Sequence, residues 1–250
     1  MFDAHFHIVD PRFPLIANDG YLPPPHVVDE YRAATAALDV RGGAVVSASF
    51  QGFDQTYLLA ALRALGPGFV GVAQLETDAP AASIRALDAA GVRALRFNLF
   101  RGGVRDFDGI EAFARRVHDL TGWHAEFYVD GASLAPIAAR LAGLPRIVID
   151  HLGMTADALP RVLDLVAGGA KVKATGFGRV SLDVAATLRA IADVDDTALM
   201  FGTDLPSTRA RRPFEAADVA LLRAALGPER AAKAMWSNAL DLYRPAGEVA

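Results

Sequence analysis

Two histidines near the start of the chain have the spacing of a shared ligand pair. His5 and His7 occur in the motif DAHFH, inside an apolar run that is typical of a β-strand. Residues i and i+2 of a strand point to the same face, so both imidazole rings can enter one pocket. Such a pair forms a natural half of a divalent-metal site. The alternative is a pair of half-buried histidines without any ligand role.

Two more polar residues follow apolar runs later in the chain. His151 ends the apolar part of RIVIDHLG, and Asp204 follows the apolar run in MFGTDLPS. An aspartate in that position can simply cap the next segment. With His5 and His7, however, these residues form an ordered set whose ligand chemistry suits one divalent metal.

Arginine supplies all of the 25 basic residues except Lys171, Lys173 and Lys233. Arg96 stands near the end of the run VRALRF, and Arg101 follows in the next loop. A buried guanidinium requires an anionic partner. That partner is either a neighbouring carboxylate or, through the two-pronged donor geometry of arginine, the carboxylate of a substrate.

The segment WHAEFYVDG places His124, Glu126 and Tyr128 on one face of a predicted strand. Tyr128 lies toward the end of this strand, where its hydroxyl can hydrogen-bond a substrate. His124 lies at the other end and is predicted to be structural. Substrate specificity is expected from loop residues, namely Asn18, Tyr21, Phe50, Gln51, Tyr57 and Arg101.

These side chains must be positioned by a repeated alternation of strands and helices. Eight largely apolar runs predict strands at Phe2–Ile8, Ala44–Ser49, Phe69–Leu75, Val92–Phe97, Ala125–Val129, Ile147–Asp150, Lys171–Thr175 and Leu199–Gly202. Helical spacing predicts helices at Val28–Leu38, Leu58–Leu65, Ala81–Ala90, Ile110–Leu120, Leu134–Leu141, Leu159–Val166, Leu182–Ala192 and Phe214–Leu226, and a last one near Glu229–Leu240.

This alternation predicts an α/β protein with a parallel sheet. A doubly wound sheet would show a glycine-rich phosphate loop after its first strand, and HFHIVDPRFP has none. We therefore expect one (β/α)8 TIM barrel, with allowance for slight distortion, that forms a single domain over residues 1–250. Its site should lie at the carboxyl ends of the strands. The proline-rich segment Asp10–Pro25 is expected to form an ordered loop over that end.

The composition excludes several classes of function. The chain has no cysteine, which excludes disulfides, thiolate catalysis and cysteine-ligated metal. A net charge of −4 argues against a nucleic-acid binder, and we expect the short arginine cluster at 209–212 to be a solvated loop. No apolar run approaches ~18 residues, and the N-terminus does not resemble a signal peptide. We expect a cytoplasmic protein with a small anionic substrate and no nucleic-acid or membrane partner.

Taken together, the motifs resemble those of the amidohydrolase superfamily, and in particular its amidohydrolase-related, lactonase-like branch. The resemblance extends through nearly the whole chain and rests on DAHFH, GVRALRFN, GWHAEFYVD, IDHLG and GTDLP. It implies a hydrolase that opens a lactone or ester, with an ionised Asp204 as the general base that activates water. It also assigns His5, His7 and His151 to polarise the carbonyl. Four residues would bind an anionic substrate: Arg96, Arg101, Arg179 and Tyr128.

One departure from the superfamily bears on the metal. Metal-dependent members usually carry a histidine on strand five, and the two-metal type adds a lysine on strand four. Here Tyr128 takes the place of that histidine, and strand four has Arg96 and no lysine. A binuclear site is therefore not expected. The lactonase-like resemblance implies turnover without a required metal; the alternative is one divalent metal such as zinc on His5, His7, His151 and Asp204.

Three functions remain open at this stage. The first is hydrolysis of a lactone that carries carboxylates. The second is another reaction in the same site, either lactone isomerisation or a metal-dependent decarboxylation or amide hydrolysis. The third is a non-catalytic barrel that binds a small acid.

Overall fold

Each predicted apolar run forms a strand, and strands that follow one another in sequence are neighbours in the sheet. The computed structural model describes residues 1–18, 20–102 and 106–247. Within these residues, eight parallel strands pair in the order β1 to β8. They are β1 (Phe2–Phe6), β2 (Gly42–Val46), β3 (Phe69–Ala73), β4 (Val92–Asn98), β5 (His124–Tyr128), β6 (Ile147–Ile149), β7 (Lys171–Ala174) and β8 (Leu199–Phe201). The predicted (β/α)8 barrel is confirmed.

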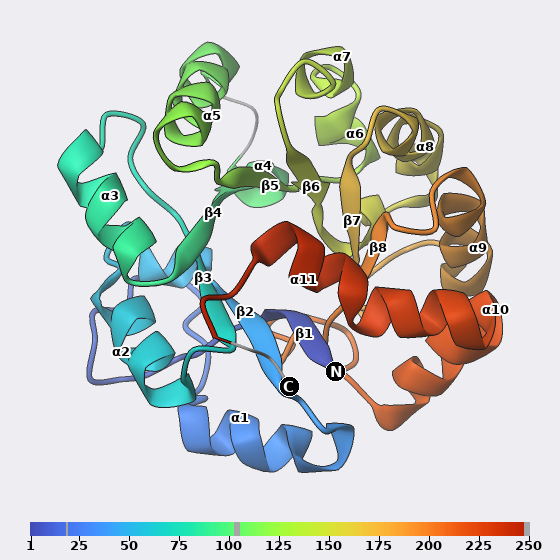
Figure 1. Ribbon diagram of the computed structural model, residues 1–250, viewed down its shortest axis with the longest axis horizontal. Coiled ribbons are helices and arrows are strands. Elements are labelled where there is room, and N and C mark those ends of the chain that lie inside the picture. The colour runs from blue at the N-terminus through green and yellow to red at the C-terminus, as the bar shows by residue number, and fades with distance from the viewer. Residues whose placement is uncertain (19, 103–105, 248–250) are drawn as a thin grey trace.

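Helices form a ring outside the strands (Figure 1). They are α1 (Val28–Thr35), α2 (Thr56–Leu65), α3 (Ala81–Ala89), α4 (Leu99–Gly102), α5 (Phe107–Thr121), α6 (Gly131–Leu134), α7 (Ala138–Leu141), α8 (Leu159–Ala167), α9 (Val184–Val194), α10 (Ala216–Met235) and α11 (Ser237–Tyr243). Short 3-10 turns occur at Ala36–Leu38, Ser49–Gln51, Asp150–Gly153 and Ala156–Ala158. Within the described part of the chain, every helix is too short or too polar to cross a bilayer.

Proline and glycine explain where the helices differ from the prediction. The helix expected over Leu134–Leu141 is two short helices, α6 and α7, because Pro136 between them lacks the N–H that a continuous helix needs. In α10, Gly227 has a positive φ of 74°, so the helical path breaks where the sequence predicts a stop. The chain then resumes a helix through Met235, and α11 follows.

A register shift in β1 turns both histidines of the DAHFH motif into the barrel. The pairing of β1 with β2 is irregular between Asp3 and Phe6. An extra residue at such a bulge changes which face the following side chains occupy. The consecutive residues Ala4 and His5 therefore both face the interior of the barrel, and His7 faces it too. Ala4 packs in the interior apolar cluster. That cluster contains Phe2, Ala4, Ala44, Val46, Val70, Val72, Ala94, Val148 and Met200, with Ala239 and Tyr243 of α11.

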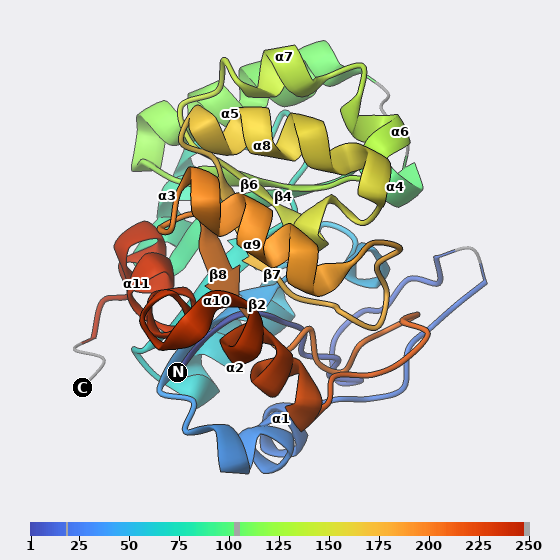
Figure 2. The same ribbon diagram turned by 90° about the vertical axis from the view of Figure 1, so that its right-hand side faces the viewer.

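The C-terminal helix closes the amino end of the barrel. Figure 1 shows α11 crossing in front of the strands, and in Figure 2 the longest loops extend on the opposite side of the molecule. Tyr243 of α11 stacks on Phe2, with ring centroids 5.6 Å apart. Its hydroxyl donates a hydrogen bond of 2.5 Å to Glu126 Oε1 on β5. With this end covered, the carboxyl end carries the loops that can admit a ligand.

The first and last strands meet without a hydrogen-bonded ladder, so the barrel is slightly unsealed among the described residues. Two backbone hydrogen bonds join them at their carboxyl ends: Asp204 N to His5 O and His7 N to Leu205 O, both 2.7 Å. The buried Asp3 carboxylate adds a bridge, since it accepts from Thr203 N at 2.8 Å and from Thr203 Oγ1 at 2.7 Å. Burial raises the pKa of Asp3 to about 6.

Replacing the bridging carboxylate should weaken the fold. Asp3→Ala removes the acceptor for Thr203 N–H, Thr203 O–H and the Tyr31 hydroxyl. Because buried donors are then left unpaired, we expect a loss of about 2–3 kcal/mol in the free energy of unfolding, measured by urea titration at pH 7. Asp29→Ala is the control, because its side chain is 93% exposed and should change stability by less than about 0.5 kcal/mol. Equal stability of the two variants would contradict a structural role for Asp3.

Candidate active site

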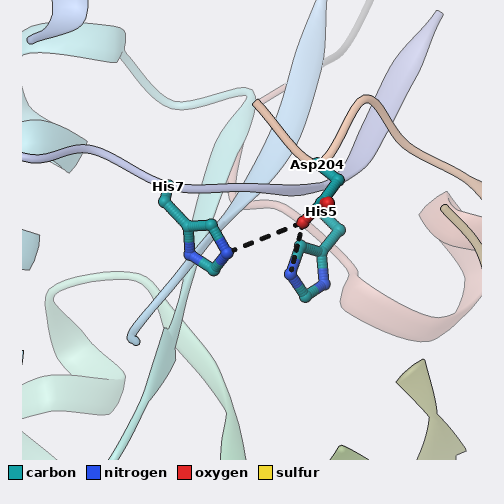
Figure 3. Close-up of side chains that lie close together, drawn as sticks. All are labelled: His5, His7 and Asp204. Carbon is teal, nitrogen blue, oxygen red and sulfur yellow. Dashed lines mark ion pairs between the residues drawn. The ribbon is translucent and has the colours of Figure 1, made fainter. Parts of the chain in front are cut away.

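Three imidazoles surround one oxygen of Asp204 inside the carboxyl end of the barrel. His5 Nε2 and His7 Nε2 each lie 3.8 Å from Asp204 Oδ1, and His151 Nε2 lies 4.0 Å from it. Figure 3 shows the rings of His5 and His7 directed at this carboxylate. All four side chains are buried. The structure thus brings together the ordered set that the sequence singled out.

Two members of this cluster have an unfavourable backbone conformation. His151 follows β6 with a φ of 50°, and Asp204 follows β8 with a φ of 59°. Residues with a Cβ rarely adopt the left-handed region, and such strain persists where surrounding contacts impose it. For Asp204 the contacts are at the seam, where its N–H donates to His5 O. This hydrogen bond therefore joins the two ends of the barrel and also orients the Asp204 carboxylate.

The three imidazoles are neutral but differ in the partner of their second nitrogen. Burial lowers the pKa of His7 to about 3, and it holds the pKa values of His5 and His151 well below the ordinary value. His7 Nδ1 lies 2.7 Å from Val46 O, which only accepts, so Nδ1 carries the proton and Nε2 a lone pair. His151 Nδ1 contacts Thr175 Oγ1 at 2.8 Å. His5 Nδ1 instead faces the ammonium of Lys173 at 3.2 Å.

Asp204 has one oxygen held and one oxygen without a hydrogen bond. Oδ2 accepts from Arg179 Nε at 2.8 Å and from Arg179 Nη2 at 2.5 Å. Oδ1 has no hydrogen-bond partner among the described residues, and the same is true of His5 Nε2, which faces it. Burial raises the pKa of Asp204, and the Arg179 guanidinium acts in the opposite direction. A held oxygen and an available one suit a carboxylate that must accept a proton in a defined direction.

Beneath the cluster lies a buried network of charges, in which the sequence predicted a role for Arg96 but not for Asp150, Lys173 or Glu126. Asp150 Oδ2 accepts from Arg96 Nε at 2.9 Å, and Asp150 Oδ1 lies 3.7 Å from Lys173 Nζ. Lys173 donates to Glu126 Oε2 at 2.5 Å. The sequence did contain a signal for this network, because Glu126 and Lys173 occur inside apolar strands, and a buried charged residue needs an oppositely charged partner. The predicted structural role of His124 agrees with its 3.1 Å contact with Glu126 Oε1, toward the end closed by α11.

A cavity lies beside the cluster. Its polar lining includes most of the residues predicted to contact substrate, with two imidazoles of the cluster: Arg96, Arg101, Tyr128, Arg179, His7 and His151. The Tyr128 hydroxyl is buried and has no hydrogen-bond partner among the described residues. Arg96 combines the two roles considered for it, because it lines the cavity and pairs with Asp150.

Three residues differ from expectation. Tyr57 belongs to α2 and is not among the lining residues; its hydroxyl lies 2.7 Å from Ser47 Oγ. Gln51 is not among the lining residues; its amide donates to Ile8 O at 2.7 Å and accepts from Ala48 N at 2.8 Å, so it supports the loops around the cavity. Arg209, expected in a solvated loop, does line the cavity. Its guanidinium hydrogen-bonds Asn18 O and lies 4.6 Å from the ring centre of Tyr21. The loops after β1 and β8 therefore meet over the site.

The donor types of the cluster suit one divalent metal, since neutral imidazoles and a carboxylate are zinc ligands. In the described part of the chain, two groups of three residues have ligand atoms within 4.8 Å of one another: His5, His7 and Asp204, and His5, Asp150 and His151. Both groups require a lone pair on a nitrogen of His5. An ammonium that donates to Nδ1 leaves the imidazole proton on Nε2, so neither nitrogen of His5 is free to bind a metal. In this arrangement the cluster does not fit a metal.

Comparison with known proteins identifies the family. A family model described as Amidohydrolase matches residues 2–244. The chain belongs to the amidohydrolase family. The resemblance inferred from its motifs is thereby confirmed.

One curated relative, a 2-pyrone-4,6-dicarboxylate hydrolase from Comamonas testosteroni, is 31% identical over 157 residues. The match covers 60% of this chain and 51% of that relative, so it spans about half the relative's length.

Solved amidohydrolase structures share the fold. A "probable 2-pyrone-4,6-dicarboxylic acid hydrolase" from Acinetobacter baumannii, with citric acid bound, has a TM-score of 0.84 at 19% identity over 97% of this chain and 98% of that one. An amidohydrolase from Burkholderia multivorans, with bound zinc, has a TM-score of 0.75 at 18% identity over 98% and 99%. At these identities the matches establish the barrel and not its chemistry.

The ion pair of Arg96 should make it essential to stability, unlike the exposed Arg101. Arg96→Met leaves the buried Asp150 with less compensation, so we expect a loss of about 3–5 kcal/mol in the free energy of unfolding. Arg101→Met should leave stability within about 0.5 kcal/mol of the parent. Urea titrations of both variants measure the difference. A fully stable Arg96→Met protein would mean that the pair with Asp150 contributes little.

Proposed function

We propose that this amidohydrolase opens a lactone that carries carboxylate groups, by attack of a water molecule that Asp204 activates, without a required metal. The observation that carries the proposal is the pair of buried atoms Asp204 Oδ1 and His5 Nε2, which have no hydrogen-bond partner among the described residues and lie beside a cavity lined by arginines. The carboxylate oxygen is an acceptor and the imidazole nitrogen is a donor, but at 3.8 Å they are too far apart to hydrogen-bond each other. Because buried polar atoms need hydrogen-bond partners, we expect a polar ligand to bind both.

The water is held by two acceptors. Asp204 Oδ1 and the lone pair of His7 Nε2 lie 3.8 Å apart, so one water molecule can donate a hydrogen bond to each. That orientation leaves an oxygen lone pair for attack on the lactone carbonyl. As the new C–O bond forms, the proton of the water passes to Asp204 Oδ1. Arg179 keeps the other carboxylate oxygen in place.

The carbonyl oxygen is bound by donors. His5 Nε2–H can donate to it and stabilise the negative charge that develops during attack. The Tyr128 hydroxyl is a second buried donor next to His151, with ring centroids 5.2 Å apart. When the tetrahedral intermediate collapses, the ring C–O bond breaks and the leaving oxygen takes the proton from Asp204. The ring-opened product carries a hydroxyl and a new carboxylic acid, which releases its proton to solvent, and the carboxylate of Asp204 is restored.

The charge of the cavity supports an anionic substrate class. The guanidiniums of Arg96, Arg101, Arg179 and Arg209 all line it, and arginine binds carboxylates through paired donors. Two of the proteins to which this chain is similar are named for 2-pyrone-4,6-dicarboxylate, so that compound is the first to test. Isomerisation, decarboxylation and simple acid binding are not favoured by these relatives. The proposal also assigns residues 1–250 to one barrel domain in the cytoplasm.

The first experiment compares activities across lactones with zero, one and two carboxylates. We expect hydrolysis of carboxylated lactones, including 2-pyrone-4,6-dicarboxylate, to be fastest. Asp204→Asn keeps the shape of the side chain but removes the base, so kcat should fall about 10²–10⁴-fold while the circular dichroism spectrum is unchanged. Asp29→Asn, on the exposed face of α1, is the control with full activity. Full activity of Asp204→Asn, or no hydrolysis of any lactone by the parent, would refute the proposed function.

A second prediction concerns pH. Asp204 must be ionised to accept a proton, so kcat/KM should fall as pH decreases through its pKa, which burial places above the ordinary aspartate value of 3.8. The Arg179 guanidinium opposes that rise, so Arg179→Met should move the acidic limb to higher pH. Arg101→Met serves as the control, because Arg101 is exposed and should leave the limb in place. An acidic limb that does not move in Arg179→Met would argue against Asp204 as the base.

A further inference from the structure

The two histidines of the DAHFH motif have opposite hydrogen-bonding environments at Nδ1. His7 Nδ1 lies against a carbonyl oxygen, Val46 O, and therefore carries the proton. His5 Nδ1 lies against an ammonium, Lys173 Nζ, and therefore accepts. We propose that Lys173 is a positioning residue that holds His5 in the tautomer with its proton on Nε2. This tautomer makes the motif a donor–acceptor pair and prevents the cluster from binding a metal.

Lys173 is held in place as a cation by the charges around it. The side chain is fully buried on β7. Its Nζ lies 2.5 Å from Glu126 Oε2, 3.2 Å from His5 Nδ1 and 3.7 Å from Asp150 Oδ1. The other oxygen of Glu126 accepts from the Tyr243 hydroxyl at 2.5 Å. A neutral amine would leave a buried carboxylate without a compensating charge, which is strongly destabilising.

The tautomer of His5 follows from the number of protons on the Lys173 ammonium and on a neutral imidazole. An ammonium has three N–H groups and no lone pair, so it can only donate to His5 Nδ1. A neutral imidazole carries one proton, and with Nδ1 as acceptor that proton resides on Nε2. Nε2–H then points toward Asp204 Oδ1, 3.8 Å away, with no hydrogen-bond partner in the described part of the chain. The space between these two atoms suits oxygen atoms of water and substrate.

The contact between Lys173 and His5 also explains why the cluster does not form a metal site, although its histidines and carboxylates are of the types that bind metals. Both candidate groups of three ligands include His5. Metal binding through Nε2 would require its proton to move to Nδ1, which would then meet the ammonium. If Lys173 were absent, Nδ1–H could instead donate to Asp150 Oδ1, which lies 3.6 Å away and has no hydrogen-bond partner among the described residues. Lys173 therefore determines whether His5 Nε2 donates a hydrogen bond or is able to bind a metal.

The test removes the ammonium without leaving a new buried charge. Lys173→Met alone leaves Glu126 unpaired and could unfold the barrel, so the main variant combines Lys173→Met with Glu126→Gln. The control is Lys171→Met, on the same strand, where the lysine is partly exposed and contacts Asp195 and Thr197. Circular dichroism and urea titration establish that each variant is folded.

The decisive readout is the tautomer of His5, measured by ¹⁵N NMR on the metal-free protein labelled at histidine. The parent and Lys171→Met should show His5 protonated at Nε2 and His7 at Nδ1. In the double variant, His5 should change to the Nδ1-protonated form while His7 stays unchanged. Parent protein with Nδ1-protonated His5, or a folded double variant that keeps the Nε2 proton, would overturn the proposal.

Zinc binding and hydrolysis complete the test. By calorimetry, the double variant should bind Zn²⁺ at least tenfold more tightly than the parent or Lys171→Met. Equal zinc affinities would overturn the metal-exclusion part of the proposal. The role of Nε2–H as a donor to the substrate rests on the proposed function; if that function holds, metal-free hydrolysis should fall about 10²-fold in the double variant. A parent without lactonase activity but with the expected NMR signals would refute the function and leave the tautomer assignment standing.

Discussion

The ammonium of Lys173 lies fully buried between the carboxylates of Glu126 and Asp150, and the rest of the site is arranged around this interaction. Buried ions are stable only when their charges and hydrogen-bonding groups are matched closely. Asp150 also binds Arg96, which lines the cavity, and Lys173 also contacts His5. The network therefore fixes the position of a guanidinium that lines the cavity together with that of an imidazole of the cluster. Tyr243 extends it to the helix that closes the barrel.

A second constraint is the seam between the two ends of the barrel. The first and last strands lack a regular ladder among the described residues, yet residues at their carboxyl ends exchange backbone hydrogen bonds. One of those bonds orients Asp204, and the Asp3 carboxylate reinforces the joint through Thr203. The hydrogen bond that closes the barrel therefore also places the proposed base, Asp204, opposite His5. This is how groups 199 positions apart in the chain, at 5 and 204, come within 3.8 Å.

The site also illustrates that residue types alone do not specify chemistry. Three neutral imidazoles and one carboxylate have the composition of a zinc site, and a related barrel contains zinc. Here the environment of each second nitrogen differs, because a carbonyl faces His7 and an ammonium faces His5. One ring becomes an acceptor and the other a donor. Such a division suits the activation of water and the polarisation of a carbonyl in one step.

Much of the molecule is determined by local sequence. Apolar runs and helical spacing predicted the eight strands and most helices, and strand-end positions predicted that His5, His7, His151 and Asp204 converge, because parallel strands bring their carboxyl ends together. Other features depended on contacts between distant segments. Local pattern did not reveal that Gln51 supports a loop, that Arg209 reaches the cavity, or that Asp150 and Lys173 neutralise each other. Above all, the proton on His5 was decided by the tertiary structure, because a tautomer depends on the atom facing each ring nitrogen, and that atom belongs to a strand 168 residues away.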